Sequence, residues 1–318
     1  QVLELMHERG HLSRAEADSL REQPLRLDYT GGDALDLYGY FNEQVEQEAR
    51  AILREAERRT GQRHDLEKDG LRITTTLDAG LQRMAAEAAH DHLASMQPKL
   101  DRELRSRKAR AAWERSTPHR RSARWKANPT STGELYDHNG RRVDTQSHRD
   151  SLWHYHRLLH AAVLIMDPAS GAVRAWVGGN DHRYLPYDLV KARRSAASTI
   201  KPFVYAAALE HGLQPCDYLD NSRKTYGDYD DWAPDNFDRD TTEGEVALWH
   251  ALARSLNRPT VDLYFRVGAD TLRTVLGAMG LPTKDADKPA MALGAASTSL
   301  LLLVPAYVSF SQCGQRLP

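Results

Sequence analysis

The order of apolar and polar positions predicts a chain that is helical at both ends, with short strands between. Apolar residues recur at helical spacing over residues 2–22 and 41–59, which predicts helices there. Ser13 and Glu16 have the Ser-x-x-Glu spacing of a capping box, so a second helix is expected to begin inside the first of these segments. The glycine-containing residues 26–40 predict a linker.

Two further regions carry strand patterns. Residues 71–76 alternate and are rich in β-branched side chains, which predicts a strand, and Asp78 is expected to cap a helix that runs to about Leu93. Residues 161–166 and 172–177 are apolar runs joined by an Asp-Pro-Ala-Ser-Gly turn, which predicts a β-hairpin buried on both faces. Because mostly helical patterns follow, the predicted fold class is α+β.

The composition indicates a folded protein of about two domains. The chain has 318 residues and a formal net charge of -1, which excludes a strongly basic nucleic-acid binder. Its mean hydropathy is -0.64, and no run reaches the ~18–20 apolar residues that span a membrane. Cys216 and Cys313 are too few for a disulfide scaffold; a single bridge between them is left open, and Cys216 is expected to be buried.

Residues 99–126 are crowded with Lys and Arg and also contain Trp113 and Trp125. A basic run with interleaved aromatic residues is one pattern of nucleic-acid binding. The alternative is a solvated helix and loop that faces an acidic polymer or a membrane. Because the whole chain is neutral and no nucleic-acid motif accompanies the run, this alternative is favoured.

The first pattern that carries chemistry is the only Ser-x-x-Lys in the chain, Ser198 to Lys201, which opens an apolar helical stretch. Residues at i and i+3 share one helix face, so the Lys201 amine can reach the Ser198 hydroxyl. A serine needs a base to become a nucleophile, and lysine serves only if its pKa falls below ~10.4, through burial or a nearby cation such as Arg193 or Arg194. Taken alone, an ordinary helix N-cap would explain the pattern better.

A second pattern is the only Ser-x-Asn, formed by Ser255 and Asn257. It is expected in a short turn between a helix over residues 245–254 and a helix that begins at Pro259. There the Ser255 hydroxyl can relay a proton between Lys201 and a leaving amine, and the Asn257 amide can bind a peptide substrate. Helix capping by Ser255 and Asn257 is the alternative; the order of the two patterns after a buried hairpin favours catalysis.

These stretches together resemble the class A penicillin-binding proteins, the bifunctional peptidoglycan synthases of bacterial cell walls. The start of the chain is similar to the last helices of the family's glycosyltransferase domain, and the later stretches follow the order of its transpeptidase region. Residues 97–155 are outside the resemblance, as an insertion or a divergent interdomain segment. The matching stretches are Val2–Met6, Ser13–Ala17, Pro24–Leu25, Gly70–Asp78 with Gln82, Asp167–Gly171, Trp176–Gly179, Arg193–Arg194, Ser198–Tyr205, Trp232–Phe237, Ser255–Val261, Ala292–Gly294 and Ala306–Phe310.

The resemblance implies acyl transfer without a metal or cofactor. Ser198 would attack the D-alanyl-D-alanine carbonyl of a stem peptide, with Lys201 as the base. Ser255 would pass the proton to the departing D-alanine, and Asn257 would bind the substrate amide. The implied partners are peptidoglycan stem peptides, glycan strands derived from lipid II, and β-lactams, with no nucleic acid. A membrane anchor would precede Gln1, so the catalytic domains would lie on the periplasmic or extracellular face of the bacterial cytoplasmic membrane.

The resemblance also implies a domain organisation. Residues 1–27 would be the last helices of a glycosyltransferase domain, whose catalytic residues lie before the chain begins. Residues 28–72 would be a linker and residues 73–160 an interdomain segment with the basic, divergent insertion. Residues 161–318 would be the N-terminal part of a transpeptidase domain.

Two features depart from the family pattern. The third motif, Lys-Thr/Ser-Gly, is absent from the chain, and the fragment alone is expected to be inactive without it. Ala196-Ala197 stands where the family usually has Pro-Gly, so Ala197 is expected to crowd the approach to the nucleophile.

Other interpretations remain open. A serine D,D-carboxypeptidase or β-lactamase would use water to take the acyl group, although the glycosyltransferase-like residues 2–25 argue against both. A non-catalytic module would bind peptidoglycan or scaffold wall synthesis. Trp232 and Asn236 would either line the cleft or serve as an aromatic packed on the nucleophile helix and an ordinary turn residue.

Overall fold

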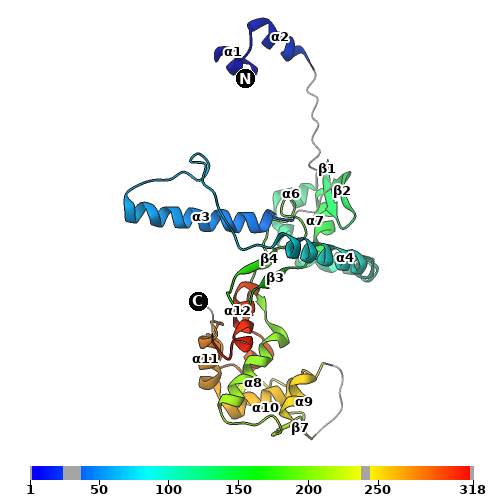
Figure 1. Ribbon diagram of the computed structural model, residues 1–318. Coiled ribbons are helices and arrows are strands. Elements are labelled where there is room, and N and C mark those ends of the chain that lie inside the picture. Colours follow the sequence, from blue (N-terminus) through cyan, green and yellow to red (C-terminus); the bar gives the residue numbers. More distant parts are fainter. Residues whose placement is uncertain (1, 24–36, 238–243, 316–318) are drawn as a thin grey trace.

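The computed structural model describes residues 2–23, 37–237 and 244–315. Helices dominate, and the strands of these residues form four separate two-stranded sheets. Figure 1 shows a helical unit at the bottom, a β-hairpin above it and a smaller subdomain beside the long helix α4 (Ala79–Glu103). Within the described residues, no helix is both long and apolar enough to cross a membrane.

The first two helices are α1 (Val2–Glu8) and α2 (Arg14–Glu22), which contact each other. The Ser13 hydroxyl accepts a hydrogen bond from the Glu16 N–H, and the Glu16 carboxylate accepts one from the Ser13 N–H. The predicted capping box is therefore confirmed. Most of the predicted linker over residues 26–40 lies outside the described residues.

Two long helices lead into the central hairpin. The predicted third helix is confirmed as α3 (Gly39–Thr60), in which Tyr40 and Phe41 are buried against the rest of the fold. The other end of α3 extends away from the body (Figure 1). The helix α4 begins after Asp78, whose carboxylate accepts hydrogen bonds from two backbone N–H groups, as predicted for an N-cap. It continues well past its predicted end at Leu93.

The predicted strand over residues 71–76 is wrong. The segment forms no strand, and all six residues are exposed. Its last residue meets β4 (Val173–Val177), where the Thr76 hydroxyl donates to the Val173 carbonyl oxygen at 2.8 Å. Strand preference mainly reflects packing of a half-buried face, and the β-branched residues here have no face to bury.

A small unit begins at the end of α4 and contains the whole basic run; we call residues 99–157 the Trp subdomain. Its core consists of Trp113, Trp125 and Trp153, each at most 8% exposed. Asn139 lies in the turn of a β-hairpin that the sequence analysis did not predict. The elements are α5 (Arg107–Ser116), the 3₁₀ helix η1 (Pro118–Arg121), α6 (Ala123–Ala127), β1 (Thr130–Asp137), β2 (Gly140–Ser147) and α7 (His148–Arg157).

The predicted central hairpin is confirmed. The strand β3 (Val163–Met166) pairs antiparallel with β4. Successive side chains of a strand point to opposite faces, so Trp176 packs with Leu164 and α3, whereas Ala175 and Val177 pack against α4. Both faces of the hairpin are therefore covered, as its continuous apolar pattern predicted.

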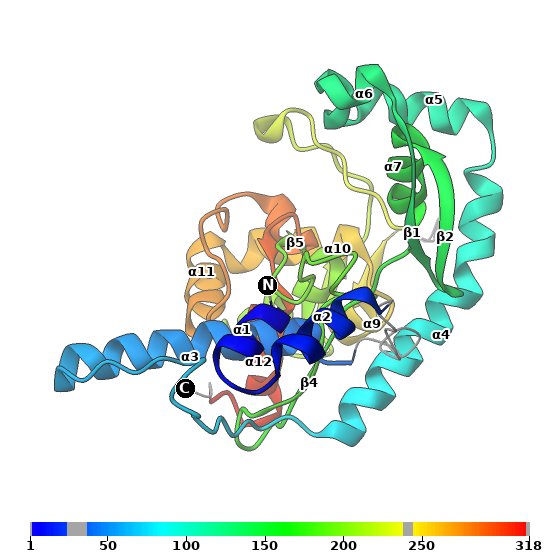
Figure 2. The same cartoon turned by 90° about the horizontal axis from the view of Figure 1, so that it is seen from above.

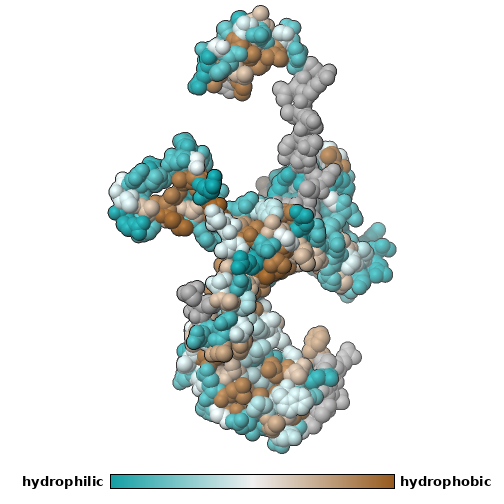
Figure 3. Space-filling model, viewed as in Figure 1, coloured by the Kyte–Doolittle hydropathy of each residue, from teal (hydrophilic) through white to brown (hydrophobic). Residues whose placement is uncertain are grey.

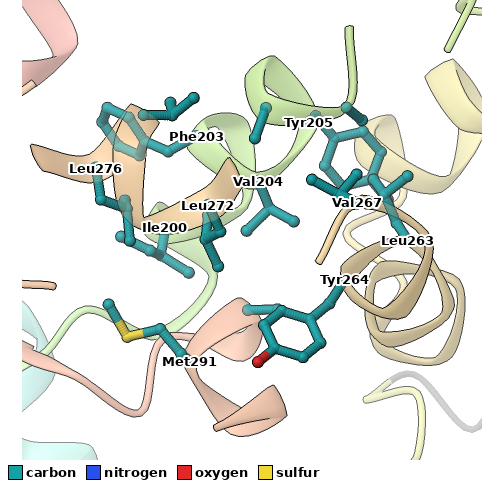
Figure 4. Close-up of a cluster of buried hydrophobic side chains, with 14 of the residues drawn as sticks. Ile200, Phe203, Val204, Tyr205, Leu263, Tyr264, Val267, Leu272, Leu276 and Met291 are labelled. Atoms are coloured by element: carbon teal, nitrogen blue, oxygen red, sulfur yellow. The ribbon is translucent and has the colours of Figure 1, made fainter. Parts of the chain in front are cut away.

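The last part of the chain is a helical unit built around α8 (Lys201–Glu210). Phe203, Val204 and Ala207 are at most 1% exposed, so α8 is enclosed by its neighbours (Figure 4). A helix that is apolar all round is expected to be buried in this way. Around it lie β5 (Arg194–Ser195), η2 (Ala197–Ile200), β6 (Tyr218–Asp220), η3 (Gly227–Tyr229), β7 (Glu245–Ala247), α9 (Leu248–Ala253), α10 (Asn257–Val267), α11 (Ala269–Ala278), η4 (Pro289–Leu293), β8 (Ser297–Thr298) and α12 (Leu300–Ser311).

The mixture of helices and short strands confirms the α+β class, but several details differ from the predictions. The helix expected from residue 245 begins at Leu248, because the three residues before it pair with β6. The next helix begins at Asn257, two residues earlier than predicted. Cys216 and Cys313 are both free and exposed. The expected burial of Cys216 is wrong, because the residue lies in the turn after α8.

Candidate active site

Ser198 and Lys201 lie at the junction of η2 and α8. Ser198 is exposed on the short 3₁₀ helix, whereas Lys201 is the first residue of α8 and is only 1% exposed. Pro202 is tolerated because the first N–H groups of a helix have no partner within the helix. An exposed hydroxyl therefore stands three residues before a buried amine.

The turn before Ser198 is strained. Ala197 has a φ of 48°, in the left-handed region that favours glycine. Its N–H donates to the Gly294 carbonyl oxygen (3.1 Å), and the Ser195 hydroxyl donates to the same oxygen (2.6 Å). A Cβ on Gly294 would lie 2.0 Å from the Ala197 carbonyl oxygen, so only glycine fits. The expected crowding by Ala197 takes the form of backbone strain, and Gly294 provides the space.

Ser255 ends α9 in the conformation that glycine usually takes. Its φ is 53°. The Leu256 N–H donates to the Ala251 carbonyl oxygen and the Ser255 N–H to the Leu252 carbonyl oxygen, which together form a Schellman cap. The residue is exposed. A non-glycine residue in this position is a strain that functional sites often contain.

The Lys201 amine faces this turn. Its Nζ donates to the Ser255 carbonyl oxygen (2.6 Å), to Asn257 Oδ1 (2.7 Å) and to Ser255 Oγ (3.2 Å). None of these three acceptors carries a full charge, and burial lowers the pKa of Lys201 to about 8. Arg193 and Arg194, the cations suggested by the sequence, are exposed and do not contribute to the pKa shift.

A polar network orients Asn257. Its Nδ2 donates to the Asp235 carbonyl oxygen (2.7 Å), which leaves Oδ1 facing the lysine amine. Asn236 Oδ1 accepts from the N–H groups of Asn257 (2.8 Å) and Arg258 (3.2 Å), while its Nδ2 donates to Asn221 Oδ1 (2.9 Å). The buried Arg258 guanidinium pairs with the Asp235 carboxylate at 2.5 Å. Residues 235 and 236 therefore fix the start of α10.

The structure thus brings Lys201, Ser255 and Asn257 into direct contact. Ser198 lies on η2, three residues before Lys201, and no hydrogen bond joins its hydroxyl to the Lys201 amine within the residues that the structure describes. Asn236 Oδ1 accepts the hydrogen bonds of the first two N–H groups of α10. The Ser255 and Asn257 side chains therefore do not cap this helix, contrary to the helix-capping alternative. The sequence analysis missed this role, because Asn236 also fits the pattern of an ordinary turn. Trp232 packs on Tyr226, with 5.9 Å between ring centroids, and not on α8.

Comparison with known proteins identifies the class of this region. Residues 161–309 match the family model of the penicillin-binding protein transpeptidase domain, and they include all four candidate residues. This part of the chain is similar to that domain family. Its sequence relatives are class A penicillin-binding proteins, which supports the resemblance found in the sequence.

Two curated relatives illustrate the similarity. Penicillin-binding protein 1A of Aquifex aeolicus is 35% identical over 162 residues, which cover 49% of this chain and 22% of that protein. Penicillin-binding protein 1B of Escherichia coli is 34% identical over 172 residues, which cover 50% of this chain and 20% of that protein. The matched region thus spans about a fifth of the length of each relative.

Solved structures show the same fold. Penicillin-binding protein 1A of Haemophilus influenzae has a TM-score of 0.59 at 21% identity, and the match covers 97% of this chain and 51% of that chain. The PonA1 protein of Mycobacterium tuberculosis, in complex with penicillin V, has a TM-score of 0.54 at 22% identity, covering 87% of this chain and 60% of that chain. The penicillin-binding transpeptidase fold is therefore shared.

Proposed function

We propose that the protein is a peptidoglycan D,D-transpeptidase that forms an acyl-enzyme on Ser198. The observation that carries this proposal is the buried Lys201 amine, which contacts both Ser255 Oγ and Asn257 Oδ1 and begins the helix that follows Ser198. Burial holds the pKa of Lys201 near 8, so a neutral amine is available as a base close to neutral pH.

In the first half-reaction, Ser198 Oγ attacks the carbonyl carbon of the penultimate D-alanine. Neutral Lys201 takes the hydroxyl proton as the Oγ–C bond forms. The peptide C–N bond then breaks, and the Ser255 hydroxyl relays a proton to the nitrogen of the departing D-alanine. The protonated amine can donate to all three oxygen atoms around it; when it loses a proton it keeps two N–H donors and gains a lone pair that can take the Ser198 proton.

Asn257 binds the substrate in this scheme. The Asn257 amide nitrogen has two N–H groups. One donates to the Asp235 carbonyl oxygen, and the other is proposed to donate to a carbonyl oxygen of the substrate peptide. In the second half-reaction an amine of a neighbouring stem peptide attacks the ester carbonyl. The C–N bond of the cross-link forms, the ester C–O bond breaks, and a proton of the attacking amine passes to Ser198 Oγ.

The proposal extends to the whole protein. Glycosyltransferase activity, an anchor in the cytoplasmic membrane and catalytic domains on its outer face are proposed from the class A relatives. β-Lactams are proposed as covalent ligands of Ser198, because the structurally similar PonA1 protein was solved in complex with penicillin V. The domain boundaries given above are proposals of the same kind.

Labelling with a fluorescent penicillin, resolved on a denaturing gel, tests the function. The chain should be run beside the full-length gene product. Ser198→Ala should abolish labelling of the full-length protein, whereas Ser170→Ala, in the distant hairpin turn, should keep it. Labelling of the folded Ser198→Ala variant would rule out this nucleophile. A folded wild-type protein that never labels would favour a non-catalytic peptidoglycan-binding module.

A further inference from the structure

The basic run of the Trp subdomain is a separate feature that the acyl-transfer chemistry does not use. Residues 99–126 contain eleven Lys and Arg but only three Asp and Glu, a net charge of +8 in a chain of net charge -1. The rest of the chain therefore carries a net charge of -9, the difference between -1 and +8. A charge asymmetry of this size indicates a surface that attracts anionic partners.

Ten of the eleven cations are exposed, and only Arg110 is partly buried, between Glu114 and Asp150. The exposed ten have no ion-pair partner among the residues that the structure describes, so their charges face solvent. We call them the basic face: Lys99, Arg102, Arg105, Arg107, Lys108, Arg115, Arg120, Arg121, Arg124 and Lys126.

The aromatic residues of the run point inward. The rings of Trp113 and Trp125 lie 5.5 Å apart and those of Trp113 and Trp153 lie 5.0 Å apart. Binding of sugar rings or nucleobases by stacking needs exposed aromatic faces, and these three are at most 8% exposed. Recognition by stacking is therefore unsuited to the basic face.

The basic face is also unsuited to binding a membrane by inserting apolar side chains into it. The large apolar side chains that the described residues expose include none between residues 85 and 142. The surface at the far end of α4 is hydrophilic (Figure 3). A membrane-binding surface normally combines cations with exposed Leu, Phe or Trp. The basic face can therefore recognise a partner only through its charge.

The Trp subdomain, which carries the basic face, borders the turn over residues 195–197 that precedes Ser198 and that we call the nucleophile turn. Figure 2 shows α5 and α6 at the outer edge of the molecule, with α7 leading back toward the centre. A cavity of about 600 Å³ lies between the two parts, lined by His156 and Arg157 on one side and by Ser195 and Thr199 on the other. A long, flexible ligand can therefore contact the basic face while one of its units occupies the site.

We propose that the basic face binds the anionic stem peptides of an uncross-linked peptidoglycan strand and so holds the strand beside Ser198. This inference rests on the proposed transpeptidase function. Each stem peptide that ends in D-alanine carries a terminal carboxylate, which guanidinium groups bind in a bidentate manner. A strand presents one such group in every repeat, so many weak exposed contacts add through multivalency.

Binding of soluble, uncross-linked strands with intact stem peptides to the full-length gene product tests this proposal. The test variant combines Arg120→Glu, Arg121→Glu, Arg124→Glu and Lys126→Glu. The matched control makes the same charge change at exposed cations elsewhere: Arg59→Glu, Arg72→Glu, Arg83→Glu and Lys284→Glu. We expect the test variant to bind at least tenfold more weakly and the control to change less than threefold.

Two conditions sharpen the result. Salt at 1 M, where the Debye length is ~3 Å, should erase the difference between the variants. Strands stripped of stem peptides should bind no better than the test variant binds intact ones. Equal loss in both variants, or tight binding of peptide-free strands, would overturn the proposal. Tighter binding to single-stranded DNA or to anionic vesicles than to strands would assign the face to another partner.

Penicillin labelling separates this proposal from the proposed function. Both variants should label at Ser198 like the wild type, which also shows that they are folded. A wild type that binds strands but never labels would contradict the transpeptidase function and leave the binding face in place. If the four substitutions to Glu prevent folding, the same four residues are changed to Gln instead. The Gln variant should bind strands at least threefold more weakly than the wild type. An unchanged affinity would overturn the proposal.

Discussion

The helical unit and the Trp subdomain use cations in opposite ways. Lys201 is 1% exposed, contacts only uncharged oxygen atoms and has its pKa lowered to about 8 by burial. Arg120, Arg121 and Arg124 are exposed. A buried cation becomes a base because its charged form is destabilised, whereas exposed cations stay charged and act by number.

The two units also differ in what holds these groups. Around Lys201, an extensive apolar core encloses α8, and a hydrogen-bonded network fixes each polar neighbour. In the Trp subdomain three tryptophans form the core, and the charged residues lie outside it. Position matters for proton transfer, whereas a binding face needs only the right sign of charge.

The largest expected effect tests the buried cation. Lys201→Met should lower the rate of penicillin acylation by about 10³-fold, because general-base catalysis contributes on this scale. In the wild type the rate should rise with pH through about 8, where the Lys201 amine becomes neutral. Stopped-flow acylation of the full-length protein measures both, and Arg120→Gln should leave the profile unchanged. A flat profile would remove Lys201 as the base.

The same titration has a consequence for stability. The folded-state pKa of Lys201 lies below its unfolded value of ~10.4, so between these values the unfolded chain binds the extra proton. The native state therefore gains stability as pH rises from about 8 toward 10.4 and loses that contribution below. Urea titrations across this range should show the gain in the wild type and a smaller one in Lys201→Met.

Trp113→Ala tests whether the two units are separable. Removing a buried tryptophan costs about 3–5 kcal/mol, which should unfold the small Trp subdomain first. Hydrogen exchange should rise in residues 99–157 while penicillin labelling at Ser198 persists. Phe203→Ala, a comparable loss within the core around α8, should instead abolish labelling. Loss of labelling in Trp113→Ala would show that the units fold as one.

The sequence predicts those parts of the fold that local patterns encode. The hairpin of β3 and β4 and the enclosed helix α8 are visible because continuous apolar runs mark burial. The hairpin of β1 and β2 was missed, since most of its residues are exposed and give no alternation. Residues 71–76 show the converse case. Their side chains alternate as in a strand, but none of them is buried, and the segment forms no strand.

The candidate site divides in the same way. Ser198 with Lys201, and Ser255 with Asn257, are short motifs that can be found by spacing. The contact that unites them joins Lys201 and Ser255, which are 54 residues apart and follow no periodic pattern. Asn236 acts on Asn257 across 21 residues, and Gly294 acts on Ala197 from a different element. Such partners are defined by tertiary packing and carry no local signature.

Gly294→Ala tests the space that the nucleophile turn requires. The new Cβ would collide with the Ala197 backbone and would sit at a φ of 82°, so a loss of about 2–3 kcal/mol is expected. The rate of penicillin acylation should fall together with the free energy of unfolding. The matched control is Gly277→Ala in α11, where the nearest atom would be 3.6 Å away; it should be neutral or slightly stabilising in thermal melts. Equal behaviour of the two variants would refute a special role for Gly294.

Asn236→Ala tests the network that orients Asn257. The variant leaves two N–H groups at the start of α10 without their acceptor, at a cost of about 1–2 kcal/mol. Asn236→Asp keeps that acceptor and should restore most of the acylation rate, although it loses the bond to Asn221. Rates compared at equal folded fraction separate orientation from stability. Failure of Asp to rescue would indicate that the contact with Asn221 matters more.

The smallest expected effect has the opposite sign. Ala197→Gly should stabilise the protein by about 0.5–1 kcal/mol, since a left-handed alanine costs more than the entropy that glycine adds to the unfolded chain. Ala196→Gly is the control: its φ is -67°, so the same change there should destabilise. A lower melting temperature for Ala197→Gly would mean that the Ala197 methyl group packs well enough to outweigh its strain. The backbone strain at Ala197 would then be a consequence of packing beside Gly294. The nucleophile turn would be stabilised by side-chain contacts, as the Trp subdomain is, and not by its backbone conformation.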